Sequence, residues 1–350
     1  AAALAAFFTA VVRPSLPHAP AFHVRAPVFG SGKTYLCELI GAFAGPAANH
    51  KVSYPTTSEE ATKVMLALLM KSPAVIEFDD MDSDWIPHGV IKRMLTAEKI
   101  ADRILGVSKI AAVSTRVLFL GSGNNVGPVR DLLRRVLTIH LDPRIPTPAT
   151  MRYSGQPVEK VRKNRGMYVV AVLTIIEAWR EAGMPRGQAN SIVTFDGAWS
   201  DYCRYPLMWL GLPDPATALI EQVKHDPDAD ALGGLMTEWY DIFGSTPTTV
   251  RKALEVAYGT RPNLLDAIRE FPVEERGEIN PSKLGRLLKK NANRIVGGYE
   301  FQQSKAYGRV AWRVVPTRVH FSPPSPPSPP LPPSEGKTGS THPHEVEIEI

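Results

Sequence analysis

A short segment near the start of the chain has the residue types that bind phosphate groups. The run Gly30-Ser31-Gly32-Lys33-Thr34 follows an apolar stretch and precedes a helical one. In that setting backbone N–H groups and the helix dipole converge on an anion, and glycines allow close approach. We expect Lys33 to contact the β- and γ-phosphates of a nucleotide and Thr34 to ligate magnesium. The candidate nucleotide-binding residues are Gly30, Ser31, Gly32, Lys33, Thr34 and Tyr35.

One residue of this segment departs from the usual phosphate-binding motif. Pro27 stands where the standard motif has its first glycine. The alternative interpretation is therefore a chance Gly-Ser-Gly-Lys-Thr sequence in an ordinary turn.

Two carboxylates follow the apolar run Ala74–Phe78. The carboxyl ends of parallel strands lie beside the phosphate-binding loop in sheets of this kind. We expect Asp79 to hold magnesium and Asp80 to orient or activate the attacking water. Glu77 is expected to face the other way and to be structural. The alternative for the pair is a solvated acidic turn at the end of a strand.

Amides follow a third apolar run, Val117–Gly121. An asparagine between the acidic pair and the γ-phosphate can position water and respond to hydrolysis. Asn124 is the first candidate and Asn125 the second. A glycine-rich turn is the alternative, because asparagine is common in such turns.

Two arginines, Arg134 and Arg135, end the predicted helix Val129–Arg135. An arginine from a neighbouring subunit can stabilise the charge that develops on the transferred phosphoryl group. Their order among the motifs favours Arg135 and then Arg134 for this role. The alternative is a surface arginine or a salt bridge.

The stretch Ile104–Val113 can form a hairpin just before the asparagine-bearing strand. In a ring, this hairpin would project into the pore, where Lys109 would meet a phosphate backbone. A solvated loop lysine is the alternative.

Strands and helices alternate in the first half, which predicts a parallel five-stranded sheet with helices on both faces. The fold class is therefore α/β, of the P-loop nucleoside triphosphatase type. The predicted strands are Ala21–Ala26, Lys51–Tyr54, Ala74–Phe78, Val117–Gly121 and Val136–Leu141, and the predicted helices are Lys33–Phe43, Thr57–Met70, His88–Ala97 and Val129–Arg135.

The second half has a different pattern. Four helices are predicted first, at Met167–Glu181, Ile192–Trp209, Ala216–Val223 and Thr248–Tyr258. Asn280 and Pro281 then begin a helix, and strands Ile295–Phe301 and Val310–Val315 follow it. A helix followed by a hairpin is typical of a winged helix. The expected domains are an N-terminal helix (1–19), a phosphate-loop ATPase domain (20–145), a helical region (146–274), a winged-helix-like domain (275–318) and a disordered proline-rich tail (319–350).

The winged segment is strongly basic. Residues 276–320 contain ten lysines and arginines against two glutamates, a net charge of +8, whereas the whole chain of 350 residues has +5. Lys289, Lys290 and Arg294 lie at or just past the end of the predicted helix, where they can contact DNA phosphates. The alternative is a helix end that favours cations through its dipole.

Composition limits the remaining choices. The two cysteines, Cys37 and Cys203, have no metal-ligand spacing, which suits a reducing cytoplasm. The apolar start, Ala1–Val12, is too short to cross a bilayer and lacks the basic start of a signal peptide. Because the chain begins without Met and in a helical pattern, we expect it to be part of a longer polypeptide.

These motifs in this order resemble the superfamily 3 branch of the AAA+ ATPases, and more narrowly the ATPase part of phage- and plasmid-type primase–helicase proteins. The segments that carry the resemblance are RPSLPHAPAF, GSGKT, FDD, DRILG, LGSGNN and LLRRVLTIHLDPR, with KLGRLLKKNANRIVGG and VAWRVV at the winged end. It covers about residues 1–318 and is strongest over 20–145.

The resemblance implies a hexameric ring that uses ATP and Mg²⁺ to move along single-stranded or forked DNA. It places the loop roles on Gly30, Gly32, Lys33 and Thr34, the acidic roles on Asp79 and Asp80, the sensor on Asn124 and the finger on Arg135. No primase domain is present in this chain, so priming would require another domain or chain.

Two function classes remain open. The first is an ATP-driven DNA helicase or translocase of a mobile element. The second is an ATP-switched initiator or helicase loader that binds DNA without unwinding it. A phosphate-loop enzyme acting on a small molecule is disfavoured by the basic winged segment.

Overall fold

The computed structural model describes residues 1–103, 110–145, 147–150, 155–224 and 226–317. The chain is a mixed α/β protein that divides into two units, Ala1–Leu235 and Met236–Ile350. Lys109 and the proline-rich tail lie outside the described residues, and so does the end of the DRILG segment. In the part of the chain that the structure describes, no helix is both long and apolar enough to cross a membrane.

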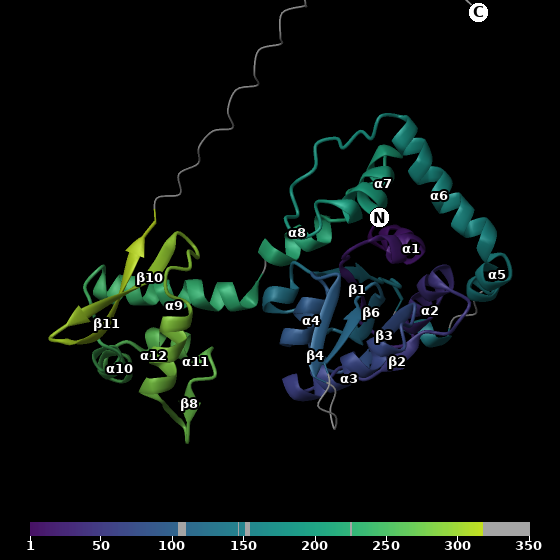
Figure 1. Cartoon of the computed structure of the whole chain (residues 1–350). Helices are drawn as coiled ribbons and strands as arrows, with labels where there is room; N and C mark the ends of the chain where they lie inside the picture. Colours follow the sequence, from purple (N-terminus) through teal and green to yellow (C-terminus); the bar gives the residue numbers. More distant parts are fainter. Residues whose placement is uncertain (104–109, 146, 151–154, 225, 318–350) are drawn as a thin grey trace, which may run out of the picture. The chain divides into compact units, whose positions relative to one another are not determined.

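A five-stranded parallel sheet forms the centre of the first unit (Figure 1). Its strands have the order β2-β3-β6-β1-β7, and all neighbouring pairs are parallel. The strands are β1 (Ala21–Ala26), β2 (His50–Val52), β3 (Val75–Met81), β6 (Leu118–Asn124) and β7 (Val136–His140). Because β1 lies between β6 and β7, the segment that follows it leaves from inside the sheet's carboxyl edge and not from one of its two ends.

Helices cover both faces of this sheet, as the sequence predicted. Along β6, Leu118 and Leu120 pack with α1 (Ala2–Val12) and α2 (Lys33–Ala44), whereas Phe119 packs with the opposite layer. That opposite layer contains α3 (Ser58–Met70) and α4 (Gly89–Met94). Alternate strand residues point to opposite faces, so a run of apolar side chains serves two cores at once.

Smaller elements complete the first unit. An antiparallel strand pair, β4 (Lys99–Arg103) with β5 (Ile110–Ser114), begins five residues before the expected hairpin Ile104–Val113, and residues 104–109 of that stretch lie outside the described residues. The remaining elements are the 3-10 turns η1 (Arg13–Ser15), η2 (Arg130–Leu132) and η3 (Pro148–Thr150), the helices α5 (Pro157–Lys163), α6 (Arg165–Glu181), α7 (Tyr205–Trp209) and α8 (Thr217–Lys224), and the π-helical turn η4 (Ser200–Arg204).

Two predicted helices are wrong in extent. The segment 129–135 forms only the short turn η2, and Arg130, the first residue of that turn, has φ +55°, outside the right-handed helical region. In the segment 192–209, residues 193–197 form turns before η4 and α7. There the Ser191 hydroxyl donates to Asp196 at 2.8 Å, a local side-chain bond that competes with helix formation.

The second unit contains a helix followed by a hairpin. Asn280 caps α12 (Pro281–Lys290) by accepting hydrogen bonds from the backbone N–H groups of Ser282 and Lys283, which confirms the predicted start. The hairpin is β10 (Tyr299–Ala306) with β11 (Arg309–Pro316). Its first strand begins later than expected, because Gly297 and Gly298 have positive φ angles and form a turn.

Several elements of the chain were not predicted. They are α5 in the first unit, α9 (Pro227–Phe243), which crosses the boundary between the units, and α11 (Pro262–Arg269), β8 (Glu274–Glu275) and β9 (Glu278–Ile279) in the second unit. The predicted helix at 248–258 is present as α10 (Val250–Gly259).

Candidate functional site

The candidate phosphate loop, residues 27–32, joins the end of β1 to the start of α2. Gly30 has φ +70° and Gly32, the residue before the helix, has φ +83°. Both values lie in the left-handed region that favours glycine. The Ser31 hydroxyl donates to the Val28 carbonyl at 2.6 Å and so closes the loop on itself. The loop therefore has the strand, turn and helix context that phosphate binding requires.

A second constraint acts on Gly30. A Cβ atom built at this position would lie 2.5 Å from the Cβ of Ala149 in η3. The segment after β7 thus packs directly on the loop, and glycine is needed at position 30 for space as well as for conformation.

Lys33 and Asn124 meet at the carboxyl edge of the sheet. The Lys33 Nζ donates to the Asn124 Oδ1 at 2.6 Å, and Lys33 is only 8% exposed. The strands make this meeting possible, since β1 and β6 are neighbours with Ala26 opposite Asn124. Asn124 lies at the end of β6 itself, because the strand continues three residues beyond the predicted end.

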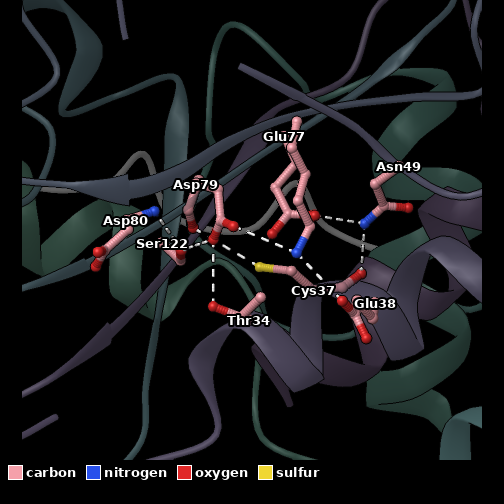
Figure 2. Close-up of polar contacts among 10 residues, drawn as sticks. Thr34, Cys37, Glu38, Asn49, Glu77, Asp79, Asp80 and Ser122 are labelled. Atoms are coloured by element: carbon pink, nitrogen blue, oxygen red, sulfur yellow. Dashed lines mark hydrogen bonds and ion pairs between the residues drawn. The ribbon is translucent and has the colours of Figure 1, made fainter. Parts of the chain in front are cut away.

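Asp79, on the next strand, accepts hydrogen bonds at both carboxylate oxygens. Its Oδ1 lies 3.2 Å from the Thr34 Oγ1 and 3.1 Å from the Ser122 Oγ (Figure 2). Its Oδ2 lies 3.3 Å from the Lys51 Nζ. Burial raises the pKa of Asp79, but its hydrogen bonds with Lys51, Ser122 and Thr34 outweigh burial, so the pKa lies below its ordinary value. The structure therefore favours an ionised carboxylate in a fixed orientation.

Asp80 occupies a β-bulge. The pairing of β3 with β6 shifts register between Phe78 and Met81, and Asp80 has φ +47°. The backbone N–H of Asp80 donates to the Ser122 Oγ at 3.2 Å. Bulges re-aim side chains next to functional sites. Here the exposed Asp80 carboxylate points away from the cluster around Asp79 (Figure 2).

The expected orientation of Glu77 is wrong. Residues i and i+2 of a strand share a face, and Glu77 lies on the same side of β3 as Asp79 (Figure 2). The Asn49 Nδ2 donates to the Glu77 carboxylate at 2.7 Å and to the Cys37 carbonyl at 3.0 Å. Burial is the main cause that raises the pKa of Glu77 to about 7. Lys51, which also pairs with Glu38 at 3.1 Å, is thus surrounded by three carboxylates.

A buried network fixes the segment that follows Asn124. The His23 Nε2 donates to the Val126 carbonyl at 2.8 Å, and the His23 Nδ1 accepts from the Trp85 Nε1 at 3.0 Å. The next residue, Gly127, bonds to the loop after β3 through both of its backbone groups. Its N–H donates to the Asp84 carboxylate and its carbonyl accepts from the Trp85 backbone N–H, each at 2.9 Å. The loops after β3 and β6 are therefore held together.

The two arginines differ in exposure. The Arg135 side chain is 13% exposed; it donates to the Lys92 carbonyl at 2.9 Å and pairs with Asp131 at 3.1 Å. The Arg134 side chain is 54% exposed and also pairs with Asp131, at 2.6 Å. The Arg135 guanidinium is therefore held between the Lys92 carbonyl and the Asp131 carboxylate, whereas the Arg134 side chain reaches the surface.

The remaining candidates lie in other places. The Tyr35 hydroxyl accepts from the Val158 N–H at 3.2 Å, so this side chain contacts the start of α5. Lys289 and Lys290 are exposed at the end of α12, and the exposed Arg294 follows them. All three basic residues belong to the second unit.

Sequence reasoning missed Lys51, Ser122, Asn49 and His23. The signal for Ser122 and His23 was a polar residue inside an apolar strand. Lys51 and Asn49 had no comparable signal, because their contacts depend on the pairing of β2 with β3.

The donor set near the loop fits magnesium. A hydroxyl and a carboxylate oxygen lie side by side, and Mg²⁺ is usually bound by one or two such oxygens together with substrate phosphates and water. Within the described ranges, no group of three or more His, Cys, Asp or Glu side chains is arranged for a metal ion.

No protein-family model matches the sequence. No curated protein is similar to it. Among solved structures, the chain is similar to one described as SCCmec type IV Cch, an active helicase, with 12% sequence identity and a TM-score of 0.29. The comparison covers 87% of this chain and 56% of that one, so the chain spans little more than half of that helicase's length.

Proposed function

We propose that this chain is an ATP hydrolase that uses magnesium and drives movement on DNA. One observation carries the proposal: Lys33, Thr34, Asp79 and Asn124 converge at the carboxyl edge of a parallel sheet, beside a glycine-containing loop at a helix start. A triphosphate at this position would meet backbone N–H groups, an ammonium and a metal-binding carboxylate.

Each side chain has a role in this proposal. Lys33 binds the β- and γ-phosphates, and Thr34 and Asp79 would hold Mg²⁺, which neutralises charge on the phosphate oxygens when bound. Asn124 lies on the strand between those of the loop and of Asp79, where it can position the attacking water. We assign the orienting or activating of that water to Asp80, whose exposed carboxylate would have to turn toward Asp79 to do so.

We assign the trans-acting arginine to Arg134 rather than Arg135. A residue that reaches into a neighbouring subunit must be exposed, and Arg134 is the more exposed of the pair. Arg135 would then hold the turn by binding Asp131 and the Lys92 carbonyl. This assignment requires a neighbouring subunit, and it therefore depends on the proposal that the chain forms a ring.

DNA binding is proposed for the second unit. Lys289 and Lys290 are exposed at the end of α12, and a helix followed by a hairpin suits a winged helix that places basic side chains against phosphates. DNA is favoured over a small-molecule substrate because this segment carries the strongest positive charge of the chain.

Replacement of Lys33 tests the proposed site. We expect Lys33→Ala to reduce ATP turnover by at least about 100-fold, the scale on which removing one charged or hydrogen-bonding stabiliser acts. Lys63→Ala is the matched control, because Lys63 makes only an exposed pair with Glu59. Turnover is measured by phosphate release, and thermal unfolding checks the fold. Retained turnover in Lys33→Ala would show that the loop is not the site.

A forked DNA substrate separates the two open function classes. A helicase displaces a strand only when ATP is present, and Lys33→Ala abolishes that displacement. An initiator or loader shows ATP-dependent binding without displacement. We expect displacement.

A further inference from the structure

The free end of the β10–β11 hairpin has an unusual turn. Ala306 pairs with Arg309, and the two residues between them, Tyr307 and Gly308, have φ angles of +49° and +74°. Two-residue turns with both central φ angles positive favour Asn-Gly or Asp-Gly. A bulky side chain is a conformational outlier at such a position. The tyrosine therefore occupies a position whose backbone conformation disfavours it.

The ring of Tyr307 has no packing role in the hairpin. Tyr307 is fully exposed, at 101% of its reference area, and Val310 beside it is 57% exposed. The hairpin's last backbone link to the rest of the unit is the pairing of Trp312 with Thr248, through two hydrogen bonds of 2.9 Å. Three further rungs extend the hairpin beyond that link, by about 10 Å. The ring thus stands at the exposed end of the hairpin.

Positive charge flanks this ring. Lys305 and Arg309 are exposed on the two strands just before and after the turn. Neither makes an ion pair within residues 236–317. An exposed aromatic face between unpaired cations is complementary to a ligand that has flat rings joined by anionic groups.

We propose that this tip, residues 305–309, is a binding site for single-stranded nucleic acid. Tyr307 stacks on an unpaired base, and Lys305 and Arg309 contact the adjoining phosphates. Stacking on aromatic side chains tolerates any base, because every base has a π-face. A single strand is favoured over a duplex because the base faces inside a duplex are already stacked on one another. The inference rests on the proposed function in taking nucleic acid as the partner, but it does not require ATP turnover.

Two substitutions at position 307 separate stacking from stability. Tyr307→Asn removes the ring and supplies the residue that the turn prefers, so we expect the melting temperature to stay the same or rise. Tyr307→Trp keeps an aromatic face. The full chain is titrated, without nucleotide, into a fluorescein-labelled oligothymidylate of about 20 nucleotides, longer than typical single-strand sites. Anisotropy reports binding, and a blunt duplex of the same length is the comparison.

We expect Tyr307→Asn to weaken single-strand binding by about 5- to 150-fold, the range reported by removal of one stacking side chain. Tyr307→Trp should bind within about twofold of the wild type, and duplex binding should change little. The ring carries no charge, so Tyr307→Asn should leave the salt dependence unchanged. Lys305→Gln should reduce the slope of log affinity against log salt by about 0.7, the value for one phosphate contact on a single strand.

Three results would overturn the proposal: wild-type binding by Tyr307→Asn, an equal loss on the blunt duplex, or an equal loss in Tyr307→Trp. Failure of the proposed function gives a different result. A wild-type chain that shows no ATP turnover but loses single-strand binding on Tyr307→Asn would refute the ATPase alone and leave this site intact.

Discussion

The carboxylate of Asp79 is held by three side chains from three different elements. Thr34 comes from α2, Ser122 from β6 and Lys51 from β2. Each partner donates, so the carboxylate must stay ionised to accept all three. Such supporting contacts orient a metal ligand and raise its affinity for the metal.

Removing one of these supporting contacts should lower the affinity of the proposed site for Mg²⁺. We expect Ser122→Ala to raise the Mg²⁺ concentration needed for half-maximal ATP turnover by about 10- to 100-fold. Ser53→Ala, at an exposed position, is the control. A titration of turnover against Mg²⁺ measures the effect. An unchanged magnesium requirement in Ser122→Ala would remove Asp79 from the metal site.

His23 makes stability depend on pH. The pKa of His23 is lowered to about 4, mainly by burial. The two hydrogen bonds of the His23 ring require its neutral form, with the proton on Nε2. The unfolded chain takes up this proton near pH 6.5, whereas the folded chain does so only near pH 4. The free energy of unfolding should therefore fall, by up to about 3 kcal/mol, as the pH is lowered through that window.

The His23→Gln variant isolates this contribution. Glutamine does not titrate, so the stability advantage of the wild type over the variant should shrink between pH 7 and pH 4.5. Urea denaturation at several pH values measures the difference. A difference that stays constant with pH would show that His23 titrates normally.

At the scale of elements, β6 is the strand on which the site depends. It supplies Ser122 and Asn124, and it lies between the strands of the phosphate loop and of Asp79. On its other face the fully buried Trp85 covers Gly121, where a Cβ atom would lie 2.4 Å from the indole Cζ2.

This close contact makes Gly121 sensitive to any added atom. We expect Gly121→Ala to destabilise the protein by about 1–3 kcal/mol, because Trp85 cannot move within its packed layer. Gly166→Ala, in α6 with open space at its Cβ position, should instead stabilise the protein by up to about 1 kcal/mol. Urea denaturation compares the two. If both variants changed stability alike, the packing argument would fail.

The sequence predicted four of the five strands well because each of them is a largely apolar run bounded by turn residues, whereas β2 (His50–Val52) shares only two residues with the predicted strand Lys51–Tyr54. β1 has the predicted bounds, and β3 and β6 continue past the predicted ends to include Asp79, Asp80 and Asn124. The extension of β3 depends on a bulge with a left-handed Asp80, and local sequence does not indicate such a backbone. Helix α9 was not predicted because it contains two adjacent glycines, Gly233 and Gly234, which disfavour a helix. The apolar residues around them nevertheless have helical spacing and are all buried: Leu232, Leu235, Met236 and Trp239.

The contacts of the site were predictable only in part. The polar residues at strand ends predicted that Lys33, Asp79 and Asn124 would lie together, since parallel strands end at one edge. The position of Lys51 depends on the register of β2 against β3, in which Lys51 pairs with Glu77. The exposure of Arg134 relative to Arg135 depends on where Asp131 and the Lys92 carbonyl lie, which is a property of the folded chain.

At the scale of the whole molecule, the proposed ring predicts complementation between inactive subunits. We expect Arg134→Ala to lose about 10³-fold or more in ATP turnover, the scale of a trans-acting arginine. Lys33→Ala should be inactive as well. A mixture should recover activity, because an intact Lys33 can face an intact Arg134 across some interfaces. Arg180→Ala, which removes an exposed pair with Glu177, is the control.

The mixing experiment also distinguishes the two arginines. Arg135→Ala should lower the melting temperature, since its guanidinium holds Asp131 and the Lys92 carbonyl together. Arg134→Ala should not. Recovery of turnover with Arg135→Ala and none with Arg134→Ala would reverse the assignment, and no recovery with either would argue against a shared site.

The position of β1 between β6 and β7 has a consequence for synthesis on the ribosome. Both neighbours of β1 come about a hundred residues later in the chain. A nascent chain that ends before residue 118 therefore contains every residue of the candidate phosphate loop but has no strand on either side of β1, which precedes that loop. The proposed nucleotide affinity should appear late during elongation, when residues 118–140 have left the exit tunnel. Until then the entropy cost of closing so long a loop is not offset by strand pairing.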